Sequence, residues 1–216
     1  PVVHQGAPVT DPDGWVDTTD LQITVQGEPW VYHAQAYLML HKPAGTECSQ
    51  KPSLYPSIYT LLPSPLRQRG GGAAAGVQAV GRLDQDTTGL LILSDDGKFI
   101  HRMTSPRHHV PKVYEVTTKH PIDATQIAKL IDGVVLDDDP KPVAAHTATQ
   151  RDTHQLSLTL TQGKYHQVKR MIAAVSNRVE ALHRSQIGRL TLTDLAPGQW
   201  RWLTAQEVSE VSAKVK

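Results

Sequence analysis

The chain has 216 residues, of which 39% are hydrophobic and 20% are charged, and its formal net charge is +1. This composition excludes a disordered chain and a fibrous protein, and no apolar run reaches the roughly 18 residues that a membrane-spanning helix needs. A net charge this close to zero gives no overall electrostatic attraction to nucleic acid. The single cysteine, Cys48, cannot form an internal disulfide, so we expect a cytoplasmic protein without membrane contact.

The N-terminal 28 residues alternate between apolar and polar positions as two short strand-like stretches, VVHQGAPV and LQITVQG. The turn-forming residues 11–14 separate them. Because this stretch is too short for a core of its own and begins without methionine, we expect it to be the second half of a small N-terminal module. A linker is predicted at 29–35.

Beyond the linker, apolar patterning predicts strands and helices in an irregular order. Strands are expected at 37–40, 77–83, 90–93, 113–118, 154–161, 180–184 and 190–195. Helices are expected at 98–104, 124–131, 167–175 and 205–211. The segment 49–76, which ends in a glycine- and alanine-rich run, is expected to be a mobile surface loop, and the acidic block 134–142 to be loop and turn. Without a regular strand-helix alternation, the sequence predicts an α+β fold with a largely antiparallel sheet.

The stretch GRLDQDTTGLLILSDDG at 81–97 carries the densest group of polar side chains, braced by apolar residues on both sides. Asp84, Asp86, Thr88 and Gly89 have the spacing of a calcium loop, but the flanks are strand-like rather than helical. On an extended segment the two carboxylates would point to opposite faces, so we do not expect them to share a substrate atom. The histidines lack ligand spacing, so no metal site is expected. A purely structural role, capping a tight turn, also remains open.

Positive charge is concentrated in two segments, 101–119 and 163–189. Their cations are Arg102, Arg107, Lys112 and Lys119, then Lys164, Lys169, Arg170, Arg178, Arg184 and Arg189. If the segments meet in space they form a basic cleft, and otherwise they are two solvated basic faces. Such a cleft around a carboxylate and the strand tyrosine Tyr114 would suit a polyanion, with a flipped base stacked on the tyrosine.

Five motifs occur in one order: MLHKPAG at 39–45, GRLDQDTTGLLILSDDG at 81–97, HRMTSPRHH with KVYEV up to 116, GKYHQVKRM at 163–171 and ALHRSQIG at 181–188. In this order they resemble the RsuA-type pseudouridine synthases, over residues 37–208. The resemblance implies an α+β catalytic domain at 35–216, with a mainly antiparallel sheet and two subdomains around a central cleft. It also implies that residues 1–34 are the remnant of an S4-like RNA-binding module without its helical first half.

The resemblance assigns roles to particular side chains. Asp84 becomes the catalytic nucleophile, Tyr114 the residue that stacks on the target base and assists proton removal, and Lys169 the cation that pairs with the aspartate. Arg170 takes the place of Lys169 if the register differs by one, while Asp86, Thr87 and Thr88 hold the loop in shape. Contacts with substrate or RNA are expected from Arg82, Lys42, Arg107, His108, Lys164, His166, Arg170 and Arg184, with Lys42 also supporting the floor of the active site. No metal or cofactor is implied.

The implied activity is isomerisation of uridine to pseudouridine in ribosomal RNA. The motifs most closely resemble those of the enzymes that act on one uridine of small-subunit (16S) rRNA. The implied partner is this RNA, or a small-subunit assembly intermediate, bound by a monomeric protein. The sequence leaves three alternatives: a large-subunit (23S) rRNA enzyme of the same family, a non-catalytic RNA-binding module and a metal-dependent nuclease.

Overall fold

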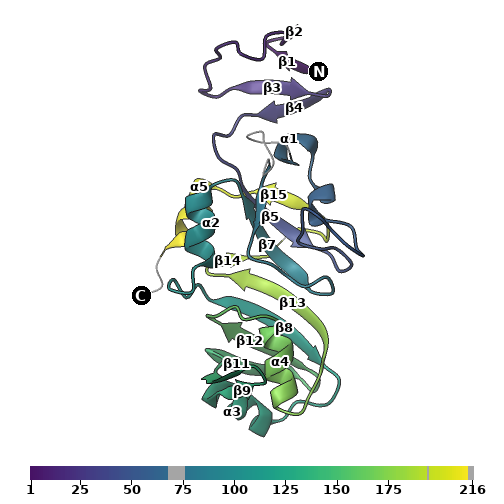
Figure 1. The fold of residues 1–216 in the computed structure, drawn as a ribbon, viewed down its shortest axis with the longest axis vertical. Coiled ribbons are helices and arrows are strands. Elements are labelled where there is room, and N and C mark those ends of the chain that lie inside the picture. The colour runs from purple at the N-terminus through teal and green to yellow at the C-terminus, as the bar shows by residue number, and fades with distance from the viewer. Residues whose placement is uncertain (68–75, 194, 214–216) are drawn as a thin grey trace.

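The computed structural model describes residues 1–67, 76–193 and 195–213, and these form two separate main sheets (Figure 1). The N-terminal sheet contains β1 (Val2–His4), β2 (Ala7–Pro8), β3 (Gln22–Val25) and β4 (Glu28–Val31) in the order β2-β1-β3-β4. Positive φ angles at Gln5 and Gly6, and again at Gln26 and Gly27, make the two-residue turns that suit antiparallel hairpins. The linker predicted at 29–35 is therefore wrong at its start, because β4 pairs with β3 there.

The N-terminal sheet contacts the rest of the protein through aromatic rings. His33 stacks on Trp202 with ring centroids 3.8 Å apart, and Trp30 meets the same indole edge-on at 5.8 Å. Trp30 also packs against the larger hydrophobic core. The small sheet is thus attached to the large domain at one end (Figure 1).

The large sheet has nine strands, seven of them in the order β11-β12-β8-β13-β7-β5-β15, with β14 paired to β13 and β6 to β7. Their bounds are β5 (Tyr37–Lys42), β6 (Gln78–Val80), β7 (Thr88–Ser94), β8 (Lys112–Thr118), β11 (Thr147–Asp152), β12 (Gln155–Leu160), β13 (Val179–Ile187), β14 (Leu190–Thr191) and β15 (Trp200–Trp202). Every pairing is antiparallel except that of β13 with β7. The predicted α+β fold with a mainly antiparallel sheet is confirmed.

Strand β7 is apolar throughout because both of its faces are buried. Leu91 and Leu93 belong to one hydrophobic core, and Leu90 and Ile92 belong to a second core on the opposite face. The second core includes side chains of α2 (Gly97–Thr104) and α5 (Ala205–Ser212), which lie beside each other in Figure 1. Helices α3 (Ala124–Asp132) and α4 (Gln167–Ala174) contribute to the first core, in the other half of the sheet.

The two halves of the large sheet join where β7 runs parallel to β13. Gly89 lies opposite Arg184 at this junction, and its φ of +113° is unfavourable for any other residue. A Cβ atom at Gly89 would lie 2.2 Å from the backbone oxygen of Arg184. Glycine is therefore required for the strands to meet, just after the loop that carries Asp84.

Most of the predicted elements are present, but four segments differ. The acidic block 134–142 is not a loop, because β9 (Val134–Leu136) pairs with β10 (Asp139–Val143) and buries Val134 and Leu136. Strands β11 and β15 were not predicted. The loop predicted at 49–76 contains the short helices η1 (Ile58–Leu61) and α1 (Ser64–Arg67), and most of its glycine-rich run lies outside the described residues. No helix in the described ranges is long and apolar enough to cross a membrane.

Candidate active site

Asp84 lies in the loop that connects β6 to β7, and the side chain of Lys42 stabilises this loop by hydrogen bonds to its backbone. The Lys42 side chain is fully buried, and its Nζ donates hydrogen bonds to the backbone oxygens of Pro43 (3.0 Å), Gln85 (3.3 Å) and Thr87 (2.9 Å). Burial lowers the pKa of this ammonium. Lys42 therefore braces the floor of the site, and the expectation that it also contacts RNA is wrong because no part of it reaches the surface.

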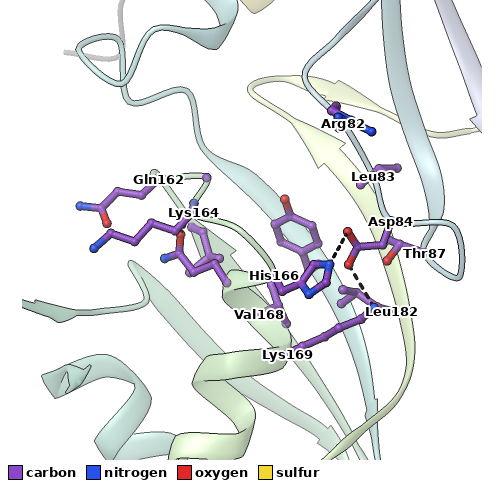
Figure 2. Close-up of a pocket in the computed structure, with 14 residues that line it drawn as sticks. Arg82, Leu83, Asp84, Thr87, Gln162, Lys164, His166, Val168, Lys169 and Leu182 are labelled. Carbon is purple, nitrogen blue, oxygen red and sulfur yellow. Dashed lines mark hydrogen bonds and ion pairs between the residues drawn. The ribbon is translucent and has the colours of Figure 1, made fainter. Parts of the chain in front are cut away.

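The carboxylate of Asp84 contacts a histidine and a lysine side chain from the start of α4. His166 Nε2 lies 3.2 Å from Oδ1, and Lys169 Nζ lies 3.0 Å from Oδ2 (Figure 2). The two partners are three residues apart, so they share one face of the helix start. The N-terminal end of a helix also favours a nearby anion. Asp84 is thus held by contacts to both oxygens, and the fallback Arg170 is not the partner.

Asp86 shares Lys169 with Asp84. Lys169 Nζ lies 2.7 Å from Asp86 Oδ1, although an extended segment was expected to separate the two carboxylates. The difference arises because residues 84–87 form a turn, closed by a hydrogen bond from Thr87 N to Asp84 O, rather than an extended strand. Partial burial favours the neutral form of Lys169, but hydrogen bonds to Asp86 and Asp84 outweigh it and raise the Lys169 pKa. The ammonium consequently stays charged between the two carboxylates.

Tyr114 lines the same small cavity as Asp84 and Lys169, together with the apolar side chains of Leu182 and Val168. It lies on β8, where it pairs in register with Leu158 of β12 and Arg184 of β13. The residue Tyr114 is 9% exposed. Asp84, Tyr114 and Lys169, which lie far apart in the sequence, therefore converge on one cavity, and apolar side chains form part of its wall.

The other residues predicted to contact RNA fall into different surroundings. Arg82 is exposed. It lines a cleft with a volume of about 740 Å³, and Asp84 lines the same cleft. Arg107 and His108 lie on the loop after α2 and line none of the cavities found around Asp84. Arg184 is buried, and its Nε donates to Leu90 O at 2.9 Å. The cleft is therefore less uniformly basic than the sequence suggested.

Two acids of the β9–β10 hairpin neutralise part of this charge. Lys164 pairs with Asp139, and Arg170 pairs with Asp138. The hydrogen bond from Lys164 lowers the pKa of Asp139. The loop predicted at 134–142 would not place these acids against the GKYHQVKRM motif, whereas the pairing of β9 with β10 does.

His166, which the family resemblance predicts only as an RNA contact, is a direct partner of Asp84. The signal that could have revealed it is the three-residue spacing to Lys169 at a predicted helix start. The backbone of His166 is left-handed, with φ of +47°, and its ring stacks on Tyr165 at 3.8 Å. Within the ranges that the structure describes, no group of three or more His, Cys, Asp or Glu side chains could hold a metal ion.

The site has the three groups that nucleophilic attack on a flipped nucleoside requires: a carboxylate held at both oxygens, a buried aromatic ring and an exposed arginine. The carboxylate is aligned in advance, the ring offers a stacking surface, and the arginine can bind the RNA strand.

Comparison with known proteins agrees with this chemistry. The family model for RNA pseudouridylate synthase matches residues 36–174. The ribosomal small subunit pseudouridine synthase A of Pasteurella multocida (strain Pm70) is 43% identical over 197 residues, which cover 90% of this chain and 81% of that protein. The protein of the same name from Escherichia coli (strain K12) is 42% identical over 183 residues, which cover 83% and 75%.

A solved structure described as a pseudouridylate synthase superimposes with a TM-score of 0.75 at 36% identity, over 97% of this chain and 88% of that one. The fold and the family that the five motifs indicate are thereby confirmed. The chain belongs to the RNA pseudouridylate synthase family and is an isomerase that converts uridine in RNA to pseudouridine.

Proposed function

We propose that Asp84 is the nucleophile of this isomerisation and that the substrate is one uridine of small-subunit (16S) rRNA. The observation that carries the first part is the position of Asp84, whose two oxygens face His166 and Lys169 in the cavity that Tyr114 lines. The second part rests on relatives named as small-subunit enzymes at 43% and 42% identity.

The uridine first leaves its stack and enters the cavity, which costs a few kcal/mol. Asp84 then attacks the sugar or the base, and the bond between N1 and the sugar carbon breaks. The uracil turns without leaving and rejoins that carbon through C5, and the bond to Asp84 breaks so that the carboxylate is regenerated. N1 gains a proton and C5 loses one, which completes the reaction. No atom is gained or lost overall, so the walls of the cavity must retain the detached base.

The roles of the neighbours follow from their contacts. Lys169 orients Asp84 through the contact of its Nζ with Oδ2. Tyr114 stacks on the uracil and assists removal of the C5 proton, while Arg82 holds the RNA backbone beside the loop. Arg107, His108, Lys164 and Arg170 bind the strand farther away, the last two in exchange for their hairpin acids.

The remaining assignments concern the whole protein. We infer that residues 1–34 are an S4-like RNA-binding module and that residues 35–216 form the catalytic domain. The small sheet, joined to the large domain through Trp30 and Trp202, supports this division. The protein acts in the cytoplasm, as a monomer, on 16S rRNA or a small-subunit assembly intermediate.

The test of the nucleophile is Asp84→Asn, with Asp86→Asn as the matched control, because both carboxylates contact Lys169. Asp84→Asn should lower turnover by at least about 10³-fold while RNA binding survives, whereas Asp86→Asn should retain most of the turnover. Equal turnover of Asp84→Asn and the unaltered protein would overturn the assignment. Assays in excess chelator, scored for pseudouridine and for strand breaks, separate this chemistry from a metal-dependent nuclease.

The target RNA is tested in a strain that lacks the protein. Pseudouridine should disappear from one position of small-subunit rRNA and return when the gene is restored. Loss from a large-subunit position instead would reject the proposed substrate and leave the nucleophile assignment intact.

A further inference from the structure

A second cavity adjoins the catalytic one and is lined by cations without any acid. It has a volume of about 440 Å³, and its charged lining residues are Arg82, Lys112, Lys164 and Arg184. Tyr114, Arg82 and Lys164 line both cavities, so the two spaces meet at the tyrosine. We call the second space the basic cavity.

The sheet itself places two of these cations together. Lys112 and Tyr114 are two residues apart on β8, so they share a face, and Arg184 lies opposite Tyr114 in the antiparallel pairing with β13. Lys112 and Arg184 are therefore fixed on rigid strands beside the base-stacking residue.

Neither cation has a counter-ion. Among the described residues, neither Lys112 nor Arg184 forms an ion pair. The Lys112 ammonium donates to Val110 O at 3.2 Å, and the Arg184 side chain donates from Nε to Leu90 O. Arg184 is 3% exposed, and its buried Nη2 has no hydrogen-bond partner within the described ranges.

This arrangement is costly for a protein that binds nothing there. Burial, and then repulsion by Arg184, lower the pKa of Lys112 to about 8. An unpaired guanidinium N–H group away from water also carries a desolvation cost. Both costs are removed when an anion with several acceptor oxygens enters the cavity.

We propose that the basic cavity binds a backbone phosphate of the substrate RNA next to the flipped uridine, through Lys112 and Arg184. The proposal rests on the proposed function, because the phosphate belongs to the strand whose uridine reaches Asp84. The flipped nucleotide carries a phosphate on each side of its sugar, and the basic cavity lies directly beyond Tyr114. A phosphate held there fixes the sugar while the base is detached.

The test compares Lys112→Met and Lys112→Arg with Lys119→Met. Lys119 follows the same strand, is exposed and lines none of the cavities, so it controls for loss of one positive charge. Affinity for a short rRNA hairpin that contains the mapped uridine is measured as a function of salt. Lys112→Met should weaken binding about tenfold and reduce the salt slope by about 0.7, with the loss mainly in KM rather than kcat. Lys112→Arg should restore both.

A second measurement identifies the phosphate. Neutral methylphosphonate linkages are placed one at a time around the target uridine. One linkage should weaken binding to the unaltered protein and cause no further loss with Lys112→Met. If every linkage weakens both proteins equally, or if Lys112→Met keeps the normal salt slope, the basic cavity is not a phosphate site.

These outcomes are distinct from failure of the proposed function. If the uridine is not in small-subunit rRNA, the unaltered protein produces no pseudouridine there, which is seen before any variant is compared. If Asp84 is not the nucleophile, Asp84→Asn remains active while the phosphate contact is still present.

Discussion

Two groups of cations lie on either side of Tyr114, and they differ in what neutralises them. On the catalytic side, Lys169 is shared by Asp84 and Asp86 at 3.0 and 2.7 Å. On the other side, Lys112 and Arg184 repel each other without an acid in the cavity lining. The difference teaches what each group does, because a paired cation can orient a protein carboxylate, whereas an unpaired one is ready to receive an anion from outside.

The largest effect should come from breaking the paired side with Lys169→Met. The substitution removes the ammonium that orients Asp84, so kcat should fall by about 10²–10³-fold. Lys169→Arg should recover much of the rate, because a guanidinium can also bridge two carboxylates. The measurement is single-turnover formation of pseudouridine.

Arg170→Met is the comparison variant for this experiment, since Arg170 is adjacent in sequence but pairs with Asp138. It should lower kcat far less than Lys169→Met. Equal losses from the two substitutions would mean that general positive charge, rather than the contact with Asp84, supports catalysis.

A second contrast concerns two lysines that the fold removes from water in different ways. Lys42 donates to three backbone oxygens, whereas Lys112 donates to only one among the described residues. Lys42→Met leaves buried carbonyl groups without a donor, so the free energy of unfolding should fall by about 2–4 kcal/mol. Chemical denaturation measures this change, and an unaltered midpoint would show that the ammonium does not brace the loop.

Lys112→Met should change stability in the opposite direction. The pKa of Lys112 is lowered from 10.5 to about 8 in the folded protein, so the unfolded chain binds more protons between these values. The penalty is therefore fully present at pH 7 and diminishes as pH rises from about 8 to 10.5. Its removal should raise the free energy of unfolding at pH 7 by up to about 3 kcal/mol, with a smaller gain at pH 10.

The same shift predicts a pH dependence of RNA affinity. Binding to the unaltered protein should weaken as pH rises past about 8, because Lys112 then loses its proton, whereas Lys112→Arg should show no such loss. If Lys112→Met lowers the free energy of unfolding at pH 7 rather than raising it, Lys112 is a structural residue.

The sequence was sufficient for the parts of the fold that depend on local patterns. The apolar run of β7, the Asp96 cap of α2 and the Gly133 end of α3 are visible in the residues themselves. Strand β11 was missed because it is polar and largely exposed, so it lacks an apolar face. The β9–β10 hairpin was missed because the acidic residues of its turn resemble a loop.

The site was predicted less completely than the fold, for a related reason. The motifs indicated Asp84, Tyr114 and Lys169, and the structure brings these residues to one cavity. Burial depends on tertiary packing, so the sequence could not show that Lys42 is enclosed or that Lys112 and Arg184 lack counter-ions. Nor could it show that two hairpin acids cover Lys164 and Arg170.

The smallest expected effect is on RNA affinity, when the aspartates that pair with Lys164 and Arg170 are replaced. Asp138→Asn and Asp139→Asn remove the partners of Arg170 and Lys164, so RNA affinity should rise about two- to fivefold, and the salt dependence should steepen. Asp137→Asn is the control, because Asp137 lies in the same exposed turn and forms no ion pair among the described residues. If all three substitutions raise affinity equally, the hairpin acts through its overall negative charge rather than through its two ion pairs. The basic cavity beyond Tyr114 is then the only one of the two sites whose cations are available before RNA binds. If only Asp138→Asn and Asp139→Asn raise affinity, the two ion pairs themselves weaken RNA binding. The cations of the basic cavity are then available at once, whereas Arg170 and Lys164 must exchange an aspartate for a phosphate.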